Sequence, residues 1–372
     1  MRIAIDARFV GTPGGLGRYT ESLVRALAAG GSGDEFVLLV GEKGKGRIVG
    51  KGISERVAAI PWYGIREQLE MPGIARSTKA DLVHWTHWNV PFRSPQPFVV
   101  TIHDLIQFGY PSARATTLGP VAYKAKRLAF EFVLHHAVRK ARLILVPTTF
   151  VRDAVAERFP FAADRIRITG EGTVALPDVD QTFVEKTLER LGVFGKYALT
   201  LGNAYPHKNL EGALAAFARV RKERPDVTYV VAGHDDWFFR RLRTEAAAGG
   251  NDRGVVFVPS PDDATAAALY RGATVYFAPS FEEGFGLPPL EAMRLGVPVV
   301  ASNGGSFPEV LGDAASYVDP RHVEAMAETL GRMFENCKEQ EHLRVVGLVQ
   351  ASSWRWEDAA EKTRMAYREA IG

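Results

Sequence analysis

The sequence has one cysteine, no long apolar run and no large excess of charge of either sign. Cys337 alone excludes an intramolecular disulfide and a cysteine-rich metal site. No segment approaches the roughly 20 consecutive apolar residues that a membrane helix needs. The N-terminus enters a strand-like stretch at Arg2 without a signal-peptide pattern, and neither internal repeats nor low-complexity tracts stand out. These absences favour a soluble, cytoplasmic protein.

What the sequence does contain is the alternation typical of an α/β protein. Its 372 residues are 46% apolar and 24% charged, a globular composition in a chain long enough for two domains. Short apolar runs alternate with segments of helical periodicity, which predicts parallel sheets covered by helices. One set of strands is expected near residues 2–6, 36–40, 57–60, 81–84, 98–102 and 143–147. A second set is expected near residues 197–201, 227–232, 255–258, 274–279, 297–300 and 315–318.

The stretch 169–180 has the weakest pattern in the chain and separates the two strand sets. We interpret it as the linker between two domains, residues 1–175 and 176–353. Helices are expected in most of the gaps between strands. The main predicted helices span residues 17–29, 121–140, 149–158, 209–223, 236–248, 263–271, 288–295, 321–335 and 354–370.

The most informative stretch is 279–293, where we expect a strand to turn into a helix. An apolar run precedes it, two glycines bend the chain, and Pro288-Pro289 suits a first helical turn. This arrangement places backbone N–H groups and a positive helix end at the carboxyl edge of a sheet, where phosphates bind. Two carboxylates, Glu283 and Glu291, frame the element. On sequence alone, each could equally be an ordinary loop or first-turn acid.

The same stretch carries a family resemblance. Glu283-Gly-Phe-Gly-Leu-Pro-Pro-Leu-Glu291 resembles the E-x7-E signature of the retaining glycosyltransferases of family four. Those enzymes share the GT-B architecture, two facing Rossmann-like domains with parallel sheets and a central cleft. The resemblance implies that Glu283 approaches the sugar, that the backbone of Phe285, Gly286 and Leu287 holds it, and that Glu291 takes the ribose hydroxyls. It also implies that the C-terminal helix, 354–372, joins the first domain.

A glycine-rich loop near the N-terminus opens a predicted helix. As a dinucleotide fingerprint it fails, because Gly15-x-Gly17-x-x-Thr20 lacks the third glycine and begins well after the strand ends. Such a loop still lets an anionic ligand approach closely, although a plain turn explains it too. The family has a matching loop that faces the sugar and diphosphate, so the resemblance makes Gly14, Gly15 and Gly17 predicted substrate-binding residues.

His103 follows the strand 98–102, at the edge where open α/β sheets bind ligands. From the residues alone, a site role and a packing role are equally supported. The family carries a histidine at the matching place, near the donor sugar, so the resemblance makes His103 a predicted catalytic residue. The aromatic stretch 84–88 suits sugar stacking or core packing equally well.

The second domain opens with another strand, glycine and helix start, and its loop carries Lys208. A lysine beside a helix N-terminus can neutralise a leaving diphosphate, although most lysines are solvated surface groups. In the family an arginine and a lysine both grip the diphosphate. Lys208 matches the lysine, whereas Asn203 stands at or near the arginine position. The second cationic contact is therefore open, and His207 is the candidate substitute.

The first half of the chain is the more basic one, with 24 Lys/Arg and 17 Asp/Glu in residues 1–180. The predicted helix 121–140 is rich in lysine and arginine, and its apolar positions include Leu128 and Phe132. We expect these apolar side chains to face the core, with a solvated basic side. The alternative is peripheral contact with an anionic membrane surface, at the inner face of the membrane.

Taken together, these motifs predict a retaining hexosyltransferase that needs no metal and no cofactor beside its nucleotide-sugar donor. Asp235 and Asp236 are expected to cap a helix rather than bind metal. Mannosyltransferase-like stretches such as Lys208-Asn-Leu make GDP-mannose the first donor. The predicted acceptor is a saccharide or lipid-linked saccharide in polysaccharide biosynthesis, and no nucleic acid is expected. A UDP-, ADP- or dTDP-sugar donor, or a nucleotide-sugar-binding protein without turnover, remain the alternatives.

Overall fold

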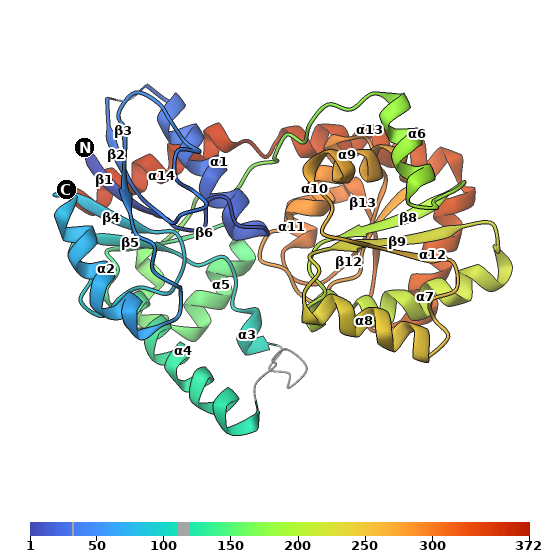
Figure 1. Ribbon diagram of the computed structural model, residues 1–372, viewed down its shortest axis with the longest axis horizontal. Coiled ribbons are helices and arrows are strands. Elements are labelled where there is room, and N and C mark those ends of the chain that lie inside the picture. Colours follow the sequence, from blue (N-terminus) through green and yellow to red (C-terminus); the bar gives the residue numbers. More distant parts are fainter. Residues whose placement is uncertain (32, 110–118) are drawn as a thin grey trace. The chain divides into compact units, whose positions relative to one another are not determined.

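The computed structural model describes residues 1–31, 33–109 and 119–372 (Figure 1). The chain forms two compact units, one of Met1–Gly172 with Arg355–Gly372 and the other of Thr173–Trp354. Each unit is built on one parallel sheet. The chain therefore leaves the first unit after Gly172 and returns to it with its last helix.

The sheet of the first unit runs in the order β3-β2-β1-β4-β5-β6-β7 within the described residues, with every pair parallel. The order reverses beside β1, which is the arrangement of a Rossmann-type sheet and puts ligand sites at the carboxyl ends of the strands. The strands are β1 (Arg2–Ala7), β2 (Glu35–Val40), β3 (Ile53–Val57), β4 (Leu82–Trp85), β5 (Phe98–Thr101), β6 (Leu143–Val146) and β7 (Ile166–Ile168).

Helices cover both faces of this sheet because alternate strand residues point to opposite sides. Ile3 and Ile5 of β1 join the core that α1 and α14 cover, whereas Ala4 joins the core that α2, α4 and α5 cover. The helices are α1 (Gly15–Ala29), α2 (Ile65–Ser77), α3 (Ile106–Gly109), α4 (Pro120–Lys140), α5 (Thr149–Arg158) and α14 (Trp356–Ile371), with a 3₁₀ turn, η2 (Pro160–Arg165).

The second unit repeats this plan with the strand order β10-β9-β8-β11-β12-β13. Its strands are β8 (Tyr197–Leu201), β9 (Thr228–Gly233), β10 (Val255–Pro259), β11 (Val275–Ala278), β12 (Val299–Ser302) and β13 (Ala315–Val318). Its helices are α6 (Gln181–Arg190), α7 (Leu210–Glu223), α8 (Trp237–Ala248), α9 (Asp263–Gly272), α10 (Leu287–Arg294), α11 (Phe307–Leu311), α12 (Val323–Glu335) and α13 (Cys337–Ser352), with 3₁₀ turns η3 (Pro206–Lys208) and η4 (Gly312–Ala314).

Several sequence-based expectations were wrong at the level of single elements. The strand expected at 57–60 is β3, which already ends at Val57. Ala58 and Ile60 suggested a strand because they are apolar, but they are buried in the core beyond its end. Strand β7 and helices α2, α6 and α13 were not predicted. Helix α2 could not be recognised from hydrophobic periodicity because its buried face includes the charged Glu67.

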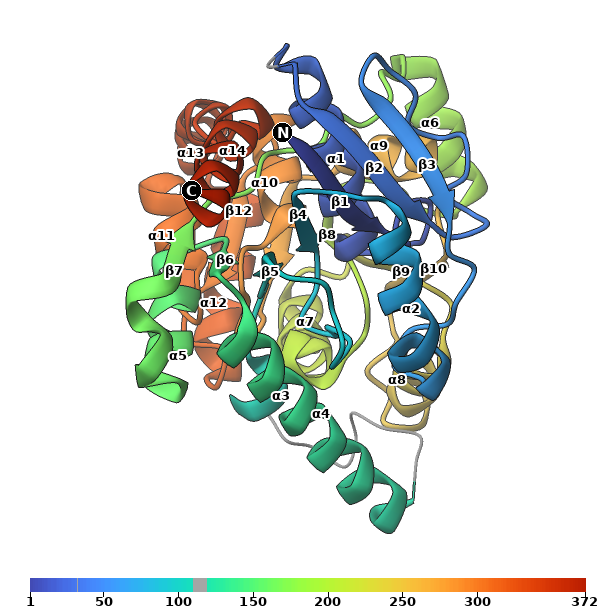
Figure 2. The same ribbon diagram turned by 90° about the vertical axis from the view of Figure 1, so that its left-hand side faces the viewer.

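The expectation for α4 was wrong for two side chains, although the helix does face the core and Val133 packs against it. Leu128 and Phe132 are 57% and 69% exposed, and the core-facing side chains are instead Leu134, Ala137 and Val138. Apolar residues occur on two sides of this helix, so only packing against the sheet decides which side is buried. The N-terminal end of α4 extends beyond the sheet (Figure 2). Among the described residues, no helix combines the length and apolar character needed to span a membrane.

A buried hydrogen-bond chain attaches α14 to the sheet. His84 on β4 has Nδ1 2.7 Å from the Tyr367 hydroxyl of α14 and Nε2 2.8 Å from Thr101 Oγ1 of β5. Thr101 Oγ1 lies 3.3 Å from the Tyr19 hydroxyl of α1. Burial, with a further contribution from the charge of His103, lowers the pKa of His84 to about 3. His84 is therefore neutral in the folded protein.

The buried histidines predict a loss of stability in acid. Burial lowers the pKa of His84 and of His87 to about 3 from an ordinary 6.5. Each contributes stability that is present above pH 6.5 and is lost as the pH falls from 6.5 toward 3, by about 1.4 kcal/mol per pH unit. His84→Gln and His87→Gln should each reduce the pH dependence of the unfolding free energy by that amount, measured by urea unfolding between pH 7.5 and 5. A variant with the full wild-type dependence would contradict the neutral assignment.

Candidate functional site

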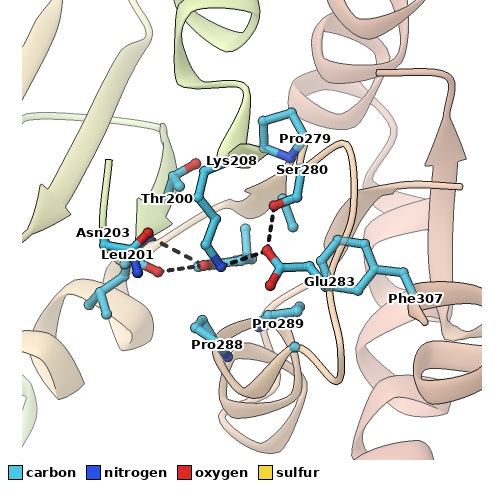
Figure 3. A pocket seen from close by; sticks show the side chains of 14 residues that line it. Thr200, Leu201, Asn203, Lys208, Pro279, Ser280, Glu283, Pro288, Pro289 and Phe307 are labelled. Carbon is cyan, nitrogen blue, oxygen red and sulfur yellow. Dashed lines mark hydrogen bonds and ion pairs between the residues drawn. The ribbon is translucent and has the colours of Figure 1, made fainter. Parts of the chain in front are cut away.

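A small pocket lies in the second unit, at the carboxyl ends of β8 and β11 and the start of α10 (Figure 3). Parallel strands bring their carboxyl ends to one edge of the sheet, which is why residues far apart in the chain meet here. Its polar and glycine lining includes Thr200, Asn203, Lys208, Ser280, Glu283 and Gly286.

An ion pair occupies the pocket. Lys208 Nζ and Ser280 Oγ both donate to Glu283 Oε1, each at 2.6 Å (Figure 3). Burial alone would raise the pKa of Glu283, but the charge of Lys208 and the two hydrogen bonds lower it below its ordinary value. Glu283 is therefore an ionised carboxylate that holds the Lys208 ammonium inside the pocket.

Gly286 is the turn from which α10 begins. Its φ of 100° lies in the region that favours glycine, and a Cβ there would stand 2.5 Å from the ring of Phe307. Gly286 lines the pocket, whereas Phe285 and Leu287 are 5% and 8% exposed and pack their side chains into the core. The turn therefore presents backbone, not side chains, to the pocket.

Glu291 lies deeper than its partner in the E-x7-E motif. It is 1% exposed on α10 and is not part of the pocket lining. The Tyr270 hydroxyl lies 3.1 Å from Glu291 Oε2 and 3.2 Å from the Pro288 carbonyl oxygen, and donates to these acceptors. The structure thus brings Glu283 and Lys208 together in the pocket, whereas Glu291 is held by Tyr270 behind the lining.

Asn203 and His207 lie beside the ion pair with different properties. Asn203 lines the pocket, and its Oδ1 is buried with no hydrogen-bond partner among the residues that the structure describes. Burial and the charge of Lys208 lower the pKa of His207 to about 4, so His207 is neutral at pH 7. In this state the predicted substitute for an arginine carries no positive charge.

Three residues that position the site were not predicted. Ser280 and Tyr270 orient the two glutamates, and Asn209 ties the lysine loop to the rest of the unit. Asn209 adopts a left-handed φ of 54°, and its Nδ2 donates to the carbonyl oxygens of Pro279 (3.1 Å) and Pro320 (2.7 Å). The preference of Asn for left-handed turns was the available signal, but its partners are 70 and 111 residues away.

The other predicted residues belong to the first unit. Gly14 has a φ of 103° and precedes α1. Apart from the adjoining chain, no described atom lies within 4 Å of a Cβ placed at Gly14 or Gly15. Gly17 is different, because its Cβ would stand 2.3 Å from the Thr12 carbonyl oxygen. Packing therefore accounts for Gly17, and ligand binding by Gly14 and Gly15 stays a prediction.

His103 is held on both sides of its ring. Its Nδ1 lies 3.2 Å from Glu171 Oε1 and its Nε2 lies 3.0 Å from the Thr86 carbonyl oxygen. The Tyr19 ring meets it edge-on, with 4.4 Å between centroids. The acidic partner, Glu171, lies in the stretch that the sequence analysis treated as linker and was missed.

Both aspartates beside α8 were expected to cap the helix, and only Asp236 does so. Asp236 Oδ1 accepts from the Phe239 backbone N–H at 2.9 Å and caps the helix, whereas Asp235 pairs with Arg240 at 2.9 Å. Within the described residues, no three His, Cys, Asp or Glu side chains are grouped to hold a metal ion.

Comparison with known families gives two matches. Residues 190–345 match the family model of glycosyl transferases group 1. Residues 13–174 match the model of Glycosyltransferase Family 4. The two matched regions follow the two units of the fold and include all the candidate site residues.

Individual proteins agree with the family matches. The chain is 29% identical over 378 residues to the O-antigen chain mannosyltransferase B of Escherichia coli, covering 95% of this chain and 96% of that protein. Among solved structures, sucrose-phosphate synthase from Thermosynechococcus elongatus superposes with a TM-score of 0.75 at 19% identity, covering 99% and 98% of the two chains. HepE of Anabaena, solved with UDP and glucose, has a TM-score of 0.75 at 18% identity, covering 99% of both. These likenesses show the GT-B fold.

The ion pair in the pocket predicts an unusual pH dependence for Lys208→Met. The variant leaves the Glu283 carboxylate partly buried without its cation, which should lower the unfolding free energy at pH 7.5 by up to about 3 kcal/mol. Burial then raises the pKa of Glu283, so the deficit should shrink as the pH falls toward 5 and the carboxyl group gains a proton. Urea unfolding at pH 7.5 and 5.5 measures both values.

The matched control is Lys338→Met, which removes an exposed lysine from α13 of the same unit. Its effect should stay below about 0.5 kcal/mol at either pH. A Lys208→Met deficit that is the same at both pH values would show that Glu283 is not the group left uncompensated.

Proposed function

The chain belongs to the group 1 glycosyltransferases of family 4, and on that premise we propose that it transfers mannose from GDP-mannose to a saccharide or lipid-linked saccharide. It is a glycosyltransferase of glycan biosynthesis with the GT-B fold. The choice of mannose is supported by similarity to the E. coli O-antigen mannosyltransferase along 95% of this chain.

One observation carries the proposal: a lysine and a carboxylate are paired in a pocket beside the first turn of α10. A donor diphosphate would compete with Glu283 for the Lys208 ammonium, because the diphosphate carries two negative charges and the carboxylate one. Once Lys208 has turned to the diphosphate, Glu283 is available to accept hydrogen bonds from sugar hydroxyls. The ion pair is thus a resting arrangement that the donor replaces.

The proposed reaction retains the anomeric configuration. The bond between the sugar C1 and the diphosphate oxygen breaks, and the acceptor hydroxyl attacks C1 on the face that the leaving group vacates. The proton of that hydroxyl passes to a donor phosphate oxygen. Lys208 and the positive end of α10 stabilise the charge that develops on the diphosphate. Glu283 and His103 orient the sugar, and Glu291 binds the ribose.

We propose that no metal is required, because the chain's own groups can neutralise the diphosphate. Asn203 offers an amide whose Nδ2 reaches a phosphate oxygen after a 180° rotation of the side chain. A bound diphosphate would also raise the pKa of His207 from about 4, so that His207 gains a proton as the donor binds. These two residues together would replace the family's arginine.

We propose that the exposed face of α4 contacts the membrane surface that holds a lipid-linked acceptor. Lys124, Leu128 and Phe132 follow one another at intervals of four residues and therefore share one side of the helix. All three side chains are exposed, and two of them, Leu128 and Phe132, are large and apolar. A basic helix with exposed large apolar side chains suits the anionic interface of a bilayer that holds a lipid-linked acceptor.

Donor binding is tested first by thermal shift in EDTA with GDP-mannose, UDP-glucose, ADP-glucose and dTDP-glucose. GDP-mannose at 100 times its Kd should add about 2.7 kcal/mol of stability and raise the Tm by several degrees. Lys208→Ala and Glu291→Ala should lose the shift, whereas the surface control Lys338→Ala should keep it.

Three results would change the proposal. A shift with another sugar nucleotide would keep the enzyme class and replace the donor. A shift that appears only with Mg²⁺ or Mn²⁺ would overturn metal independence. Binding of GDP-mannose without GDP release, when membrane-derived acceptors are supplied, would support a binding protein without turnover.

Membrane contact is tested by sedimentation with vesicles. Wild-type protein should bind vesicles rich in phosphatidylglycerol and not pure phosphatidylcholine. The double variant Leu128→Ser, Phe132→Ser should weaken binding at least about tenfold, because each side chain contributes about 1.5–3 kcal/mol when fully buried. The matched control is Val349→Ser, which removes a 68% exposed apolar side chain of α13 in the second unit. Equal binding by all forms would reject the α4 surface.

A further inference from the structure

The contacts of His103 determine its protonation state. The Glu171 carboxylate, 3.2 Å from Nδ1, accepts hydrogen bonds, and so does the Thr86 carbonyl oxygen, 3.0 Å from Nε2. Both ring nitrogens must therefore carry hydrogen for both contacts to be hydrogen bonds. That form is the imidazolium, which bears a positive charge.

We propose that Glu171 is a positioning residue for the transfer reaction: its carboxylate fixes the His103 ring and keeps it protonated, so that His103 acts as a fixed positive charge. This inference rests on the proposed function, in which His103 faces the donor sugar. It assigns a role to Glu171 and excludes His103, in this arrangement, as the general base that takes the acceptor proton.

The groups around His103 reinforce its charge. Burial opposes ionisation, but hydrogen bonding and the negative charge of Glu171, with further help from the Thr86 carbonyl and Asp104, raise the pKa of His103. His87, whose ring centroid is 6.5 Å away, is neutral because burial lowers its pKa to about 3. His84 is neutral for the same reason, and burial raises the pKa of Tyr19, which also stays uncharged.

Glu171 is itself held by the backbone on either side of it. The preceding Gly170 has a φ of 75°, and a Cβ on the following Gly172 would stand 2.4 Å from the Trp356 backbone nitrogen. Both glycines are therefore required by the path of the chain, and the side chain between them is 5% exposed. Glu171 cannot shift without moving the point where the chain returns to the first unit.

A fixed cation suits the proposed reaction better than a neutral histidine. The transition state carries extra negative charge on the diphosphate oxygen that leaves C1, and a preoriented positive group stabilises such charge without reorganisation. The acceptor proton goes to the phosphate, so no base is lost when His103 is already protonated. Glu171 orients the His103 ring and raises its affinity for a proton, and it contacts no substrate atom itself.

The test uses Glu171→Gln, which keeps the size of the side chain but removes its charge. In the variant, the pKa of His103 should fall by about 1 to 3, as measured by NMR titration of ¹³C-labelled histidine. The alkaline limb of the kcat profile should move to lower pH by the same amount. As a result, kcat should fall about tenfold or more at pH 8 and much less at pH 6, with little change in the KM for donor. Glu171→Asp should restore part of the shift.

Two controls separate positioning from a structural effect. Glu369→Gln removes another carboxylate of the first unit, one that pairs with Arg167 at the surface, and should leave the pH profile unchanged. In a His103→Gln background, Glu171→Gln should cause no further loss of kcat, because its effect passes through the histidine.

An unchanged His103 pKa in Glu171→Gln would overturn the proposal, and so would an equal loss of kcat in the His103→Gln background. The NMR titration needs no substrate. If the protein transfers no sugar, the proposed function fails while the titration still decides the pairing of His103 with Glu171. If Glu171→Gln does not fold, the same titration and pH profile on Glu171→Asp decide, with half-sized shifts expected.

Discussion

The ion pair of Lys208 and Glu283 is the interaction on which the candidate site of the second unit depends. It joins two loops that are 75 residues apart in sequence and that leave neighbouring parallel strands. The backbone reinforces it, since the Phe281 N–H donates to the His207 carbonyl oxygen at 2.7 Å. Burying such a pair costs desolvation energy, which further hydrogen bonds to the charged groups offset. Ser280 supplies one of these bonds to Glu283. The pair thus keeps two opposite charges ready for a ligand that must be recognised by both.

The first unit places its own buried charges at the carboxyl end of β1. Arg8 is 2% exposed and donates from Nη2 to Asp6 Oδ2 at 2.7 Å and to Glu67 Oε1 at 2.6 Å, and Asn89 donates to the same glutamate oxygen. One guanidinium thus contacts two carboxylates, and burial raises the pKa of Glu67, which favours its neutral form and limits the net charge of the network. It also explains why α2 has a glutamate on its buried face. Both units therefore place buried ion pairs beside the carboxyl ends of their strands.

The fold was largely predictable because the hydrophobic pattern of an α/β protein is local. Parallel strands buried on both faces appear as short continuous apolar runs, and most expected strands lie within a few residues of those observed. Errors arose where the burial of a side chain does not follow the hydrophobic pattern of the sequence. Glu67 lies on a buried helix face because Arg8 and Asn89 donate hydrogen bonds to it, while Leu128 and Phe132 are apolar and exposed because α4 buries another side. Neither fact is visible in the segment that contains it.

Glycine, proline and charge patterns by themselves determined where the turns of the candidate site lie: a left-handed glycine, a proline-started helix and a loop lysine have strong local preferences. The tertiary structure alone decided which of these groups meet. It brought Lys208 to Glu283 and Ser280, buried Glu291 under Tyr270, and set Glu171 against His103 across 68 residues of sequence. Backbone preference acts over a few neighbouring residues, whereas charge compensation and pKa depend on distances between distant segments, and only packing fixes those distances.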